Sequence, residues 1–125
     1  MKILLIEDSK SHMALIYKLV VKVKNVEPIL ADDALDAYAI LRATPDIKAI
    51  LVDQNLPYLK GTDFIAKLKS TKQFCDLPII VSTAEQDVEK FLKAGASEVL
   101  LKPYDINRLM DILENLKLIE DEIAP

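Results

Sequence analysis

Acidic, hydroxyl and lysine side chains follow four apolar segments of this 125-residue chain. The groups are Glu7–Asp8 after the first segment, Asp53 after the third, Ser82–Thr83 at the end of the fourth and Lys102–Pro103 after the fifth. Three carboxylates that lie close together repel one another unless a cation binds between them. Oxygen ligands alone favour Mg²⁺ or Mn²⁺ over zinc. With such an ion bound, one carboxylate can attack phosphorus while the ion and the lysine neutralise the developing charge.

Five short apolar segments position these groups, and each is followed by a helical pattern. The segments are nearly continuous in apolar residues, which is typical of strands covered on both faces of a parallel sheet. We predict strands over 2–6, 26–30, 47–52, 77–82 and 98–101, and helices over 9–24, 33–42, 62–70, 87–94 and 105–118. This (βα)5 alternation predicts a doubly wound α/β fold. Ligands of such sheets bind at the carboxyl ends of the strands, so the polar groups should meet there.

The composition limits the classes of function. With 51% hydrophobic and 29% charged residues, the chain is typical of one compact domain. A net charge of -4 argues against direct binding of nucleic acid, which begins with a basic surface. No apolar segment approaches the roughly 20 residues of a membrane span. Cys75 is the only cysteine and cannot form an internal disulfide, so we expect a cytoplasmic protein that does not enter a membrane.

Four motifs resemble those of the receiver domain of two-component response regulators, in its single-domain, chemotaxis-regulator-like form. They are IEDS at 6–9, VDQNLPYLKG at 52–61, PIIVSTA at 78–84 and LLKPY at 100–104. The resemblance spans residues 1–118 and leaves 119–125 as a C-terminal tail or the start of a linker. It implies a flavodoxin-like sheet in the order 2-1-3-4-5 and a cis peptide bond before Pro103.

The resemblance also implies a phosphoacceptor and a metal site. Asp53 would accept a phosphoryl group from a sensor histidine kinase or a phosphotransfer protein. Asp8 would bind Mg²⁺ directly, Glu7 would bind it through a water, and the backbone carbonyl of Asn55 would complete the protein ligands. Such a chain catalyses only its own phosphorylation and dephosphorylation, so we do not expect a conventional enzyme.

Further roles follow from the same resemblance. The hydroxyl of Thr83 would turn toward the phosphoryl group, and Lys102 would pair with its oxygens. Asn55 and Glu85 lie two residues beyond the acceptor and the hydroxyl. Polar residues at these two positions are expected to shorten the lifetime of the phosphate, because they can position an attacking water.

Candidate partner contacts are Leu15, Val99 and Tyr104. Leu15 is expected to be exposed on the first helix, where a kinase docks in the resembled family, and Tyr104 to pack or to contact partners. Val99 replaces an aromatic residue that links phosphorylation to the output surface in many receivers, and the fourth helix is about one turn short. His12 has no predicted partner, so we interpret it as a solvated or docking-surface residue and not as a phosphoryl relay. The output would go to a downstream protein or to a C-terminal domain outside these residues.

Two alternatives stay open. A pseudo-receiver would keep the fold and act as a phosphorylation-independent interaction module, and Val99 and the short fourth helix favour it. An Mg²⁺ phosphatase with an aspartate nucleophile is the remoter alternative. Haloacid-dehalogenase-like enzymes carry a second aspartate two residues after the nucleophile, and Asn55 stands in that place.

Overall fold

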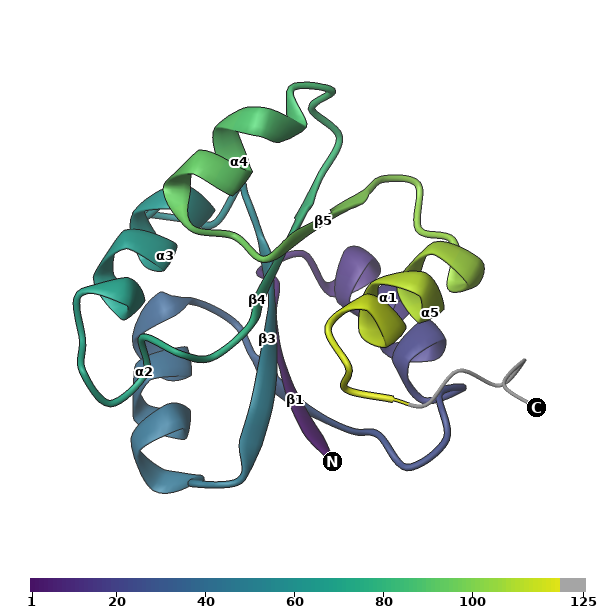
Figure 1. Ribbon diagram of the computed structural model, residues 1–125, viewed down its shortest axis with the longest axis horizontal. Helices are drawn as coiled ribbons and strands as arrows, with labels where there is room; N and C mark the ends of the chain where they lie inside the picture. The colour runs from purple at the N-terminus through teal and green to yellow at the C-terminus, as the bar shows by residue number, and fades with distance from the viewer. Residues whose placement is uncertain (120–125) are drawn as a thin grey trace.

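The computed structural model describes residues 1–119, in which five strands alternate with five helices (Figure 1). The strands are β1 (Lys2–Ile6), β2 (Glu27–Ala31), β3 (Ile47–Asp53), β4 (Ile79–Thr83) and β5 (Glu98–Leu101). The helices are α1 (Lys10–Val20), α2 (Ala34–Ala43), α3 (Gly61–Lys69), α4 (Val88–Ala94) and α5 (Ile106–Asn115). All paired strands are parallel and lie in the order β2-β1-β3-β4-β5. The predicted fold class and strand order are therefore confirmed.

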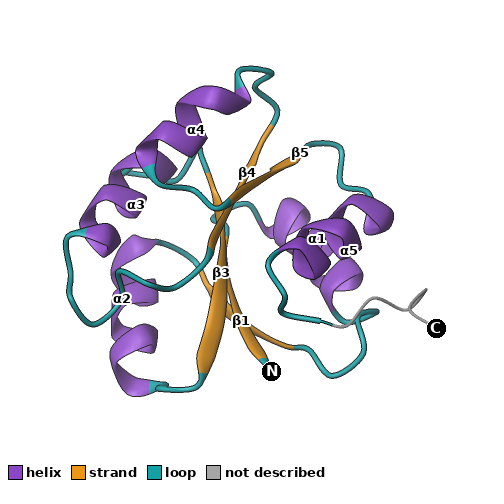
Figure 2. Ribbon diagram, viewed as in Figure 1, coloured by secondary structure: helices purple, strands orange, loops and turns teal. Residues whose placement is uncertain are grey.

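Helices cover both faces of the sheet. Figure 2 shows α1 and α5 on one face and α2, α3 and α4 on the other. Alternate residues of a strand point to opposite faces. Leu4 and Ile6 of β1 accordingly pack in the cluster beneath α2, α3 and α4, whereas Ile3 and Leu5 pack beneath α1 and α5. This two-sided burial explains why the strand segments of the sequence are continuously apolar.

Three helices begin at a polar cap. Ser9, Asp33 and Asp105 precede α1, α2 and α5, and the side chain of each accepts a hydrogen bond from a backbone N–H of the first turn. Such caps satisfy N–H groups that have no partner within the helix. Each cap therefore fixes the residue at which its helix begins, and with it the side chains of the first turn that lie near the end of the preceding strand.

Two helices end earlier than predicted. The extension of α1 to residue 24 is wrong because the hydrogen bonds tighten after Val20: the N–H of Lys22 donates to the carbonyl of Leu19 at 3.2 Å and that of Val23 to the carbonyl of Val20 at 3.0 Å. The extension of α5 to residue 118 is wrong because Lys117 has a φ of 59°, and the N–H of Leu118 bonds back to the carbonyl of Leu113 at 2.9 Å. A left-handed residue cannot continue a right-handed helix.

The start of α3 depends on a residue outside the helix. Lys60 occupies the cap position but its side chain makes no capping hydrogen bond. Gln54 supplies two acceptors instead: its Oε1 accepts from the N–H of Thr62 at 3.0 Å, and its carbonyl accepts from the N–H of Gly61 at 2.9 Å. Gln54 is buried directly after the last residue of β3. The loop 55–60 is therefore held at both of its ends.

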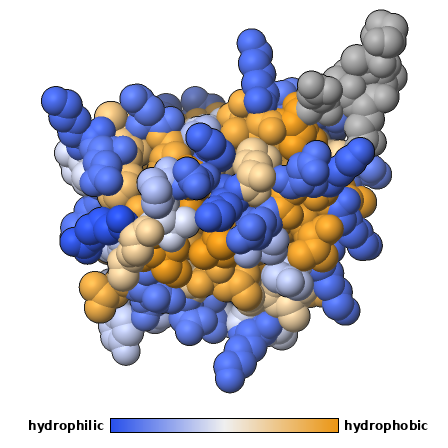
Figure 3. Space-filling model, turned by 90° about the horizontal axis from the view of Figure 1, so that it is seen from below, coloured by the Kyte–Doolittle hydropathy of each residue, from blue (hydrophilic) through white to orange (hydrophobic). Residues whose placement is uncertain are grey.

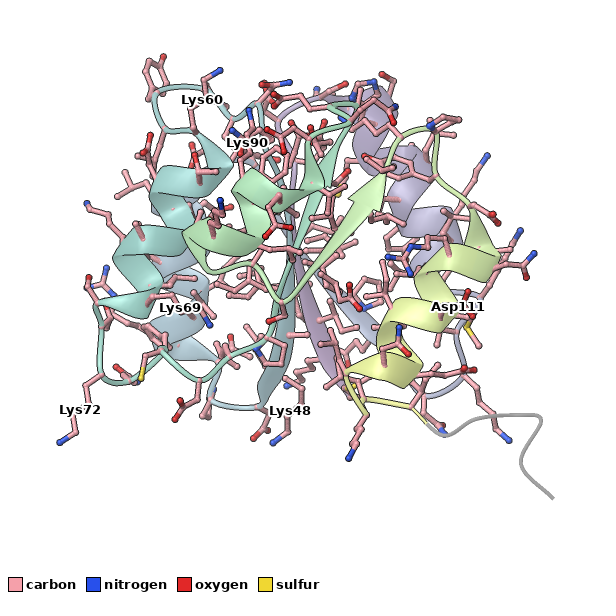
Figure 4. The ribbon with its side chains drawn as sticks, turned by 45° about the horizontal axis from the view of Figure 1, so that its top comes forward. Lys48, Lys60, Lys69, Lys72, Lys90 and Asp111 are labelled. Carbon is pink, nitrogen blue, oxygen red and sulfur yellow. The ribbon has the colours of Figure 1, made fainter. Side chains whose placement is uncertain are left out.

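Charged side chains occur at both edges of the sheet. In Figure 4, Lys60 and Lys90 lie toward the carboxyl edge, and Lys48 and Lys72 lie toward the opposite edge. Figure 3 shows the face below the molecule of Figure 1, where hydrophilic and hydrophobic residues are intermixed. Across residues 1–119, no helix has both the length and the apolar character needed to span a membrane. The predicted tail or linker, 119–125, lies outside the described residues except for Ile119.

Candidate functional site

Three carboxylates converge at the carboxyl edge of the sheet. Glu7 and Asp8 follow β1, and Asp53 is the last residue of β3, the neighbouring strand. Ile6 lies opposite Val52 in the β1–β3 register, so the residues that follow emerge at the same level. One carboxylate oxygen from each of Glu7, Asp8 and Asp53 lies within 4.8 Å of the others. The expected convergence of these three side chains is confirmed.

Two of the three carboxylates in the cluster are buried, and the three together carry an excess of negative charge. Glu7 and Asp53 are each only 4% exposed, and Glu7 Oε2 is buried without a hydrogen-bond partner among the described residues. Burial, and then the charge of Asp53, raise the pKa of Glu7 from 4.5 to about 7. A divalent cation would relieve both the repulsion and the missing partner. Because all the donors are oxygens, the residues fit a hard ion such as Mg²⁺.

Lys102 pairs with Asp53. Its Nζ lies 2.8 Å from Asp53 Oδ1, but the approach is poorly aligned for a hydrogen bond, so Oδ1 retains capacity for another group. Asp53 Oδ2 accepts from the N–H of Asn55 at 3.1 Å. Burial lowers the pKa of Lys102, and the pairing with Asp53 and the charges nearby outweigh that effect, so its pKa is raised. Lys102 therefore stays protonated, and the cis peptide bond before Pro103 is confirmed.

Thr83 ends β4 with its side chain buried at 1% exposure. Its Oγ1 accepts from the N–H of Glu85 at 3.1 Å, which leaves its own proton free to donate. The N–H of Lys102 donates to the carbonyl of Thr83 at 2.8 Å, so these two residues are held side by side. The carboxylate of Glu85 is exposed and forms an ion pair with Lys90 of α4. Asn55 is also exposed, at the rim of the site.

His12 has partners that the sequence did not reveal. Its Nδ1 lies 3.2 Å from Glu7 Oε1 and 3.4 Å from Lys102 Nζ. The predicted exposure is confirmed, since the side chain is 47% exposed, but the prediction of no partner is wrong. The reason is the helix start at Ser9, which brings the first turn of α1 back over the end of β1.

The three predicted partner residues differ in exposure. Leu15 is 53% exposed, as expected. Val99 is 3% exposed and packs in the cluster that contains Val81 and Phe91, so its assignment to a partner surface is wrong. The position belongs to the core because its side chain faces α4, which covers this side of the sheet. Tyr104 is half-buried, and its hydroxyl accepts from Ser82 Oγ at 3.1 Å.

An acidic cluster at the carboxyl edge of a flavodoxin-like sheet, with a hydroxyl and a lysine beside it, defines a phosphoacceptor signalling domain. A family model described as "Response regulator receiver domain" matches residues 3–114. The chain belongs to this family. Its acidic pocket is consistent with Mg²⁺-dependent aspartate phosphorylation, and it is a signalling protein, not a conventional enzyme.

Relatives of similar length support this assignment. "Chemotaxis protein CheY1" of Helicobacter pylori is 30% identical over 117 residues, which cover 91% of this chain and 94% of the relative. A "Chemotaxis protein CheY homolog" of Campylobacter jejuni is 28% identical over 119 residues, covering 93% and 92% of the two chains.

Solved structures give the same result. Chemotaxis protein CheY4 of Vibrio cholerae superposes with a TM-score of 0.80 at 26% identity, covering 91% of this chain and 96% of that one. The receiver domain of a sensor histidine kinase of Pseudomonas aeruginosa, solved with a magnesium ion in its active-site cleft, has a TM-score of 0.75 at 27% identity. That match covers 91% of this chain and 94% of the other.

Proposed function

We propose that Asp53 accepts a phosphoryl group from a sensor histidine kinase or a phosphotransfer protein, and that the modified chain binds its partners differently. The observation that carries this proposal is the pairing of Asp53 Oδ1 with Lys102 Nζ at 2.8 Å beside two further carboxylates. In this arrangement the ammonium group of Lys102 can stabilise added negative charge, and a carboxylate oxygen of Asp53 can form a new bond.

Asp53, Lys102 and Thr83 have different roles in the phosphoryl transfer. A carboxylate oxygen of Asp53 forms a bond to phosphorus as the phosphorus–nitrogen bond of the donor histidine breaks. Lys102 neutralises charge on the phosphoryl oxygens, and Thr83 donates its free hydroxyl proton to one of them. Phosphorylation adds a charge of about -1.5 to -2, which is enough to reorder contacts at the edge of the sheet.

Glu7, Asp8 and Asp53, together with the backbone carbonyl of Asn55, would hold Mg²⁺, with Mn²⁺ as a substitute. When bound, the ion supplies positive charge to the phosphoryl oxygens and offsets the repulsion among the carboxylates. As the resemblance to receiver domains implies, Asp8, which is exposed at the rim, would be a direct ligand, and Glu7 would act through a water. The unpartnered Glu7 Oε2 supports this assignment.

Asn55 and Glu85 would tune how long the phosphate persists. Both side chains lie at the exposed rim of the site, where an attacking water arrives. The ion pair between Glu85 and Lys90 holds the Glu85 carboxylate toward α4, so breaking that pair would change its effect on the lifetime.

The chain would pass its signal to a downstream protein or to a C-terminal output domain. Exposed Leu15 of α1 is proposed as a contact for the phosphodonor. We also propose that the protein acts in the cytoplasm and does not itself bind nucleic acid, in keeping with its net charge of -4.

One mass spectrum tests the proposal. Incubation with acetyl phosphate or phosphoramidate and Mg²⁺ should add one phosphoryl group, which EDTA suppresses and Asp53→Asn abolishes. Asp63→Asn, at an exposed aspartate of α3, is the matched control and should be modified like the wild type. An unmodified wild type would favour the pseudo-receiver, whereas turnover of p-nitrophenyl phosphate would revive the phosphatase.

A further inference from the structure

A small cavity lies on the inner side of the acidic cluster. Its volume is about 10 Å³, which is at the lower limit of the space that can hold one water. The lining combines four polar residues with aliphatic side chains of β1, α1 and β3: Glu7, Asp53, Ser82, Tyr104, Leu5, Ile6, Ile16 and Leu51. A cavity of this size is occupied by water when polar groups supply two to four hydrogen bonds.

Two carboxylate oxygens beside the cavity lack hydrogen-bond donors. Glu7 Oε2 is buried and lacks a donor, and Asp53 Oδ1 has only its poorly aligned contact with Lys102. A buried acceptor left without a donor destabilises the folded protein, and more strongly when it is charged.

Tyr104 has a proton to give. Ser82 Oγ donates to the Tyr104 hydroxyl at 3.1 Å, so the hydroxyl oxygen is already an acceptor and its own proton is free. The hydroxyl is held in place because the ring is half-buried and lies 6.0 Å from Lys102 Nζ. A water in the cavity can accept from Tyr104 and donate one proton to each carboxylate. That gives it about three hydrogen bonds, the usual number for a buried water.

We propose that Tyr104 and Ser82 are positioning residues for the metal site, and that they act on Glu7 and Asp53 through one internal water held in this cavity. The inference rests on the proposed function, because Glu7 and Asp53 are the residues that would hold the metal. Ser82 fixes the direction of the Tyr104 hydroxyl, Tyr104 fixes the water, and the water donates to Glu7 Oε2 and Asp53 Oδ1, so that it fixes how the two carboxylates are presented to the ion.

The effect on metal affinity follows from this arrangement. Groups that hydrogen-bond to metal ligands usually change metal affinity by about 10- to 100-fold when removed. Tyr104→Phe removes only the hydroxyl, so the ring still fills its half-buried position. We expect this variant to weaken Mg²⁺ binding by about ten-fold, at the lower end of that range because the contact passes through a water.

Calorimetric titration of the metal-free full chain with Mg²⁺ tests the proposal. The variants are Tyr104→Phe, Ser82→Ala and the double variant, and the control is Tyr17→Phe, at an exposed tyrosine of α1. Ser82→Ala should weaken binding by roughly three-fold. The double variant should bind no more weakly than Tyr104→Phe, because Ser82 acts through Tyr104. Equal affinity of Tyr104→Phe and Tyr17→Phe would overturn the proposal, as would additive effects in the double variant.

Two further measurements separate this role from a general structural one. Infrared carboxylate bands assigned to Glu7 with the Glu7→Gln variant should shift in Tyr104→Phe, whereas a loss of stability alone would not move them. A high-resolution crystal structure should show the internal water in the wild type and not in Tyr104→Phe. A wild type that binds no Mg²⁺ would refute the proposed metal site, and a cavity without water would refute this inference alone. If Tyr104→Phe does not fold, the smaller loss of Mg²⁺ affinity expected for Ser82→Ala tests the proposal.

Discussion

Replacing Glu7 by glutamine tests whether the acidic cluster stores electrostatic strain in the metal-free protein. The carboxylate is 4% exposed, and burial together with Asp53 raises its pKa from 4.5 to about 7. Between these two pH values the folded protein keeps a proton that the unfolded chain has lost. The contribution of Glu7 to the free energy of unfolding is therefore greatest below about pH 4.5 and falls as the pH rises toward 7. Glutamine has a similar shape and stays neutral at every pH.

The size of the effect follows from the same values. One pKa unit corresponds to about 1.4 kcal/mol, so ionising Glu7 in the folded protein costs about 3 kcal/mol more than in the unfolded chain. The Glu7→Gln variant also loses the attraction between Glu7 and Lys102, which reduces the increase in the free energy of unfolding. We expect Glu7→Gln to raise the free energy of unfolding by about 2 kcal/mol at pH 8 in EDTA, or the melting temperature by roughly 6 to 10 °C.

Thermal and urea unfolding at pH 4.5 and pH 8, with EDTA or with Mg²⁺, measure this effect. The advantage of Glu7→Gln should be present at pH 8 and absent at pH 4.5. Added Mg²⁺ should stabilise the wild type more than the variant, because the ion binds the native wild-type site more tightly. Glu85→Gln is the matched control, since its carboxylate is exposed nearby, and it should change stability by less than about 0.5 kcal/mol.

Two results would refute the reasoning. One is a Glu7→Gln variant that is less stable than the wild type at pH 8 in EDTA. The other is a stability difference that does not change between pH 4.5 and pH 8, because burial of the charge would then not be its cause.

Three further substitutions test the backbone conformation and the core packing near the site. Tyr58→Gly should raise the unfolding free energy by about 0.5 to 1 kcal/mol, because Tyr58 is fully exposed and has a positive φ of 68°; a lower melting temperature would contradict this. Gly61→Ala should destabilise by about 1–3 kcal/mol in urea unfolding. Its Cβ would lie 2.8 Å from Gln54 Oε1 and 3.0 Å from Gln54 Cα, and an unchanged urea midpoint would mean that the loop adapts freely. Phe91→Ala, at a position with 0% exposure, should cost about 3–5 kcal/mol, and a smaller loss by calorimetry would mean that the short α4 collapses into the space.

The sequence was sufficient for the sheet and for the acidic cluster. Continuous apolar segments identify strands buried on both faces, and the parallel sheet then brings Glu7, Asp8 and Asp53 to one edge. These inferences depend on local patterns and on a general rule of topology.

The features that sequence reasoning missed depend on details of the backbone or on contacts across the fold. α1 ends where the hydrogen bonds change after Val20 to shorter ones, from Lys22 N–H to the Leu19 carbonyl and from Val23 N–H to the Val20 carbonyl, and no apolar pattern reports this change. His12 reaches Glu7 because of where the Ser9 cap starts the helix, although the serine before the helical pattern was a usable signal. The hydrogen bond between Ser82 and Tyr104 joins residues that are 22 positions apart, and only the packing of the β5–α5 connection against β4 brings them together.

The tie between Gln54 and the first turn of α3 has an evolutionary consequence. A side chain at position 61 would collide with the amide at position 54, and a shorter residue at 54 would leave the N–H of Thr62 without its acceptor. A change at either position alone would weaken the segment that follows Asp53. Because the Cβ at position 61 would also lie 3.0 Å from Gln54 Cα and 3.1 Å from the Asp53 carbonyl, descendants of this gene should keep glycine at 61, and at 54 they should keep a side chain that can accept from Thr62.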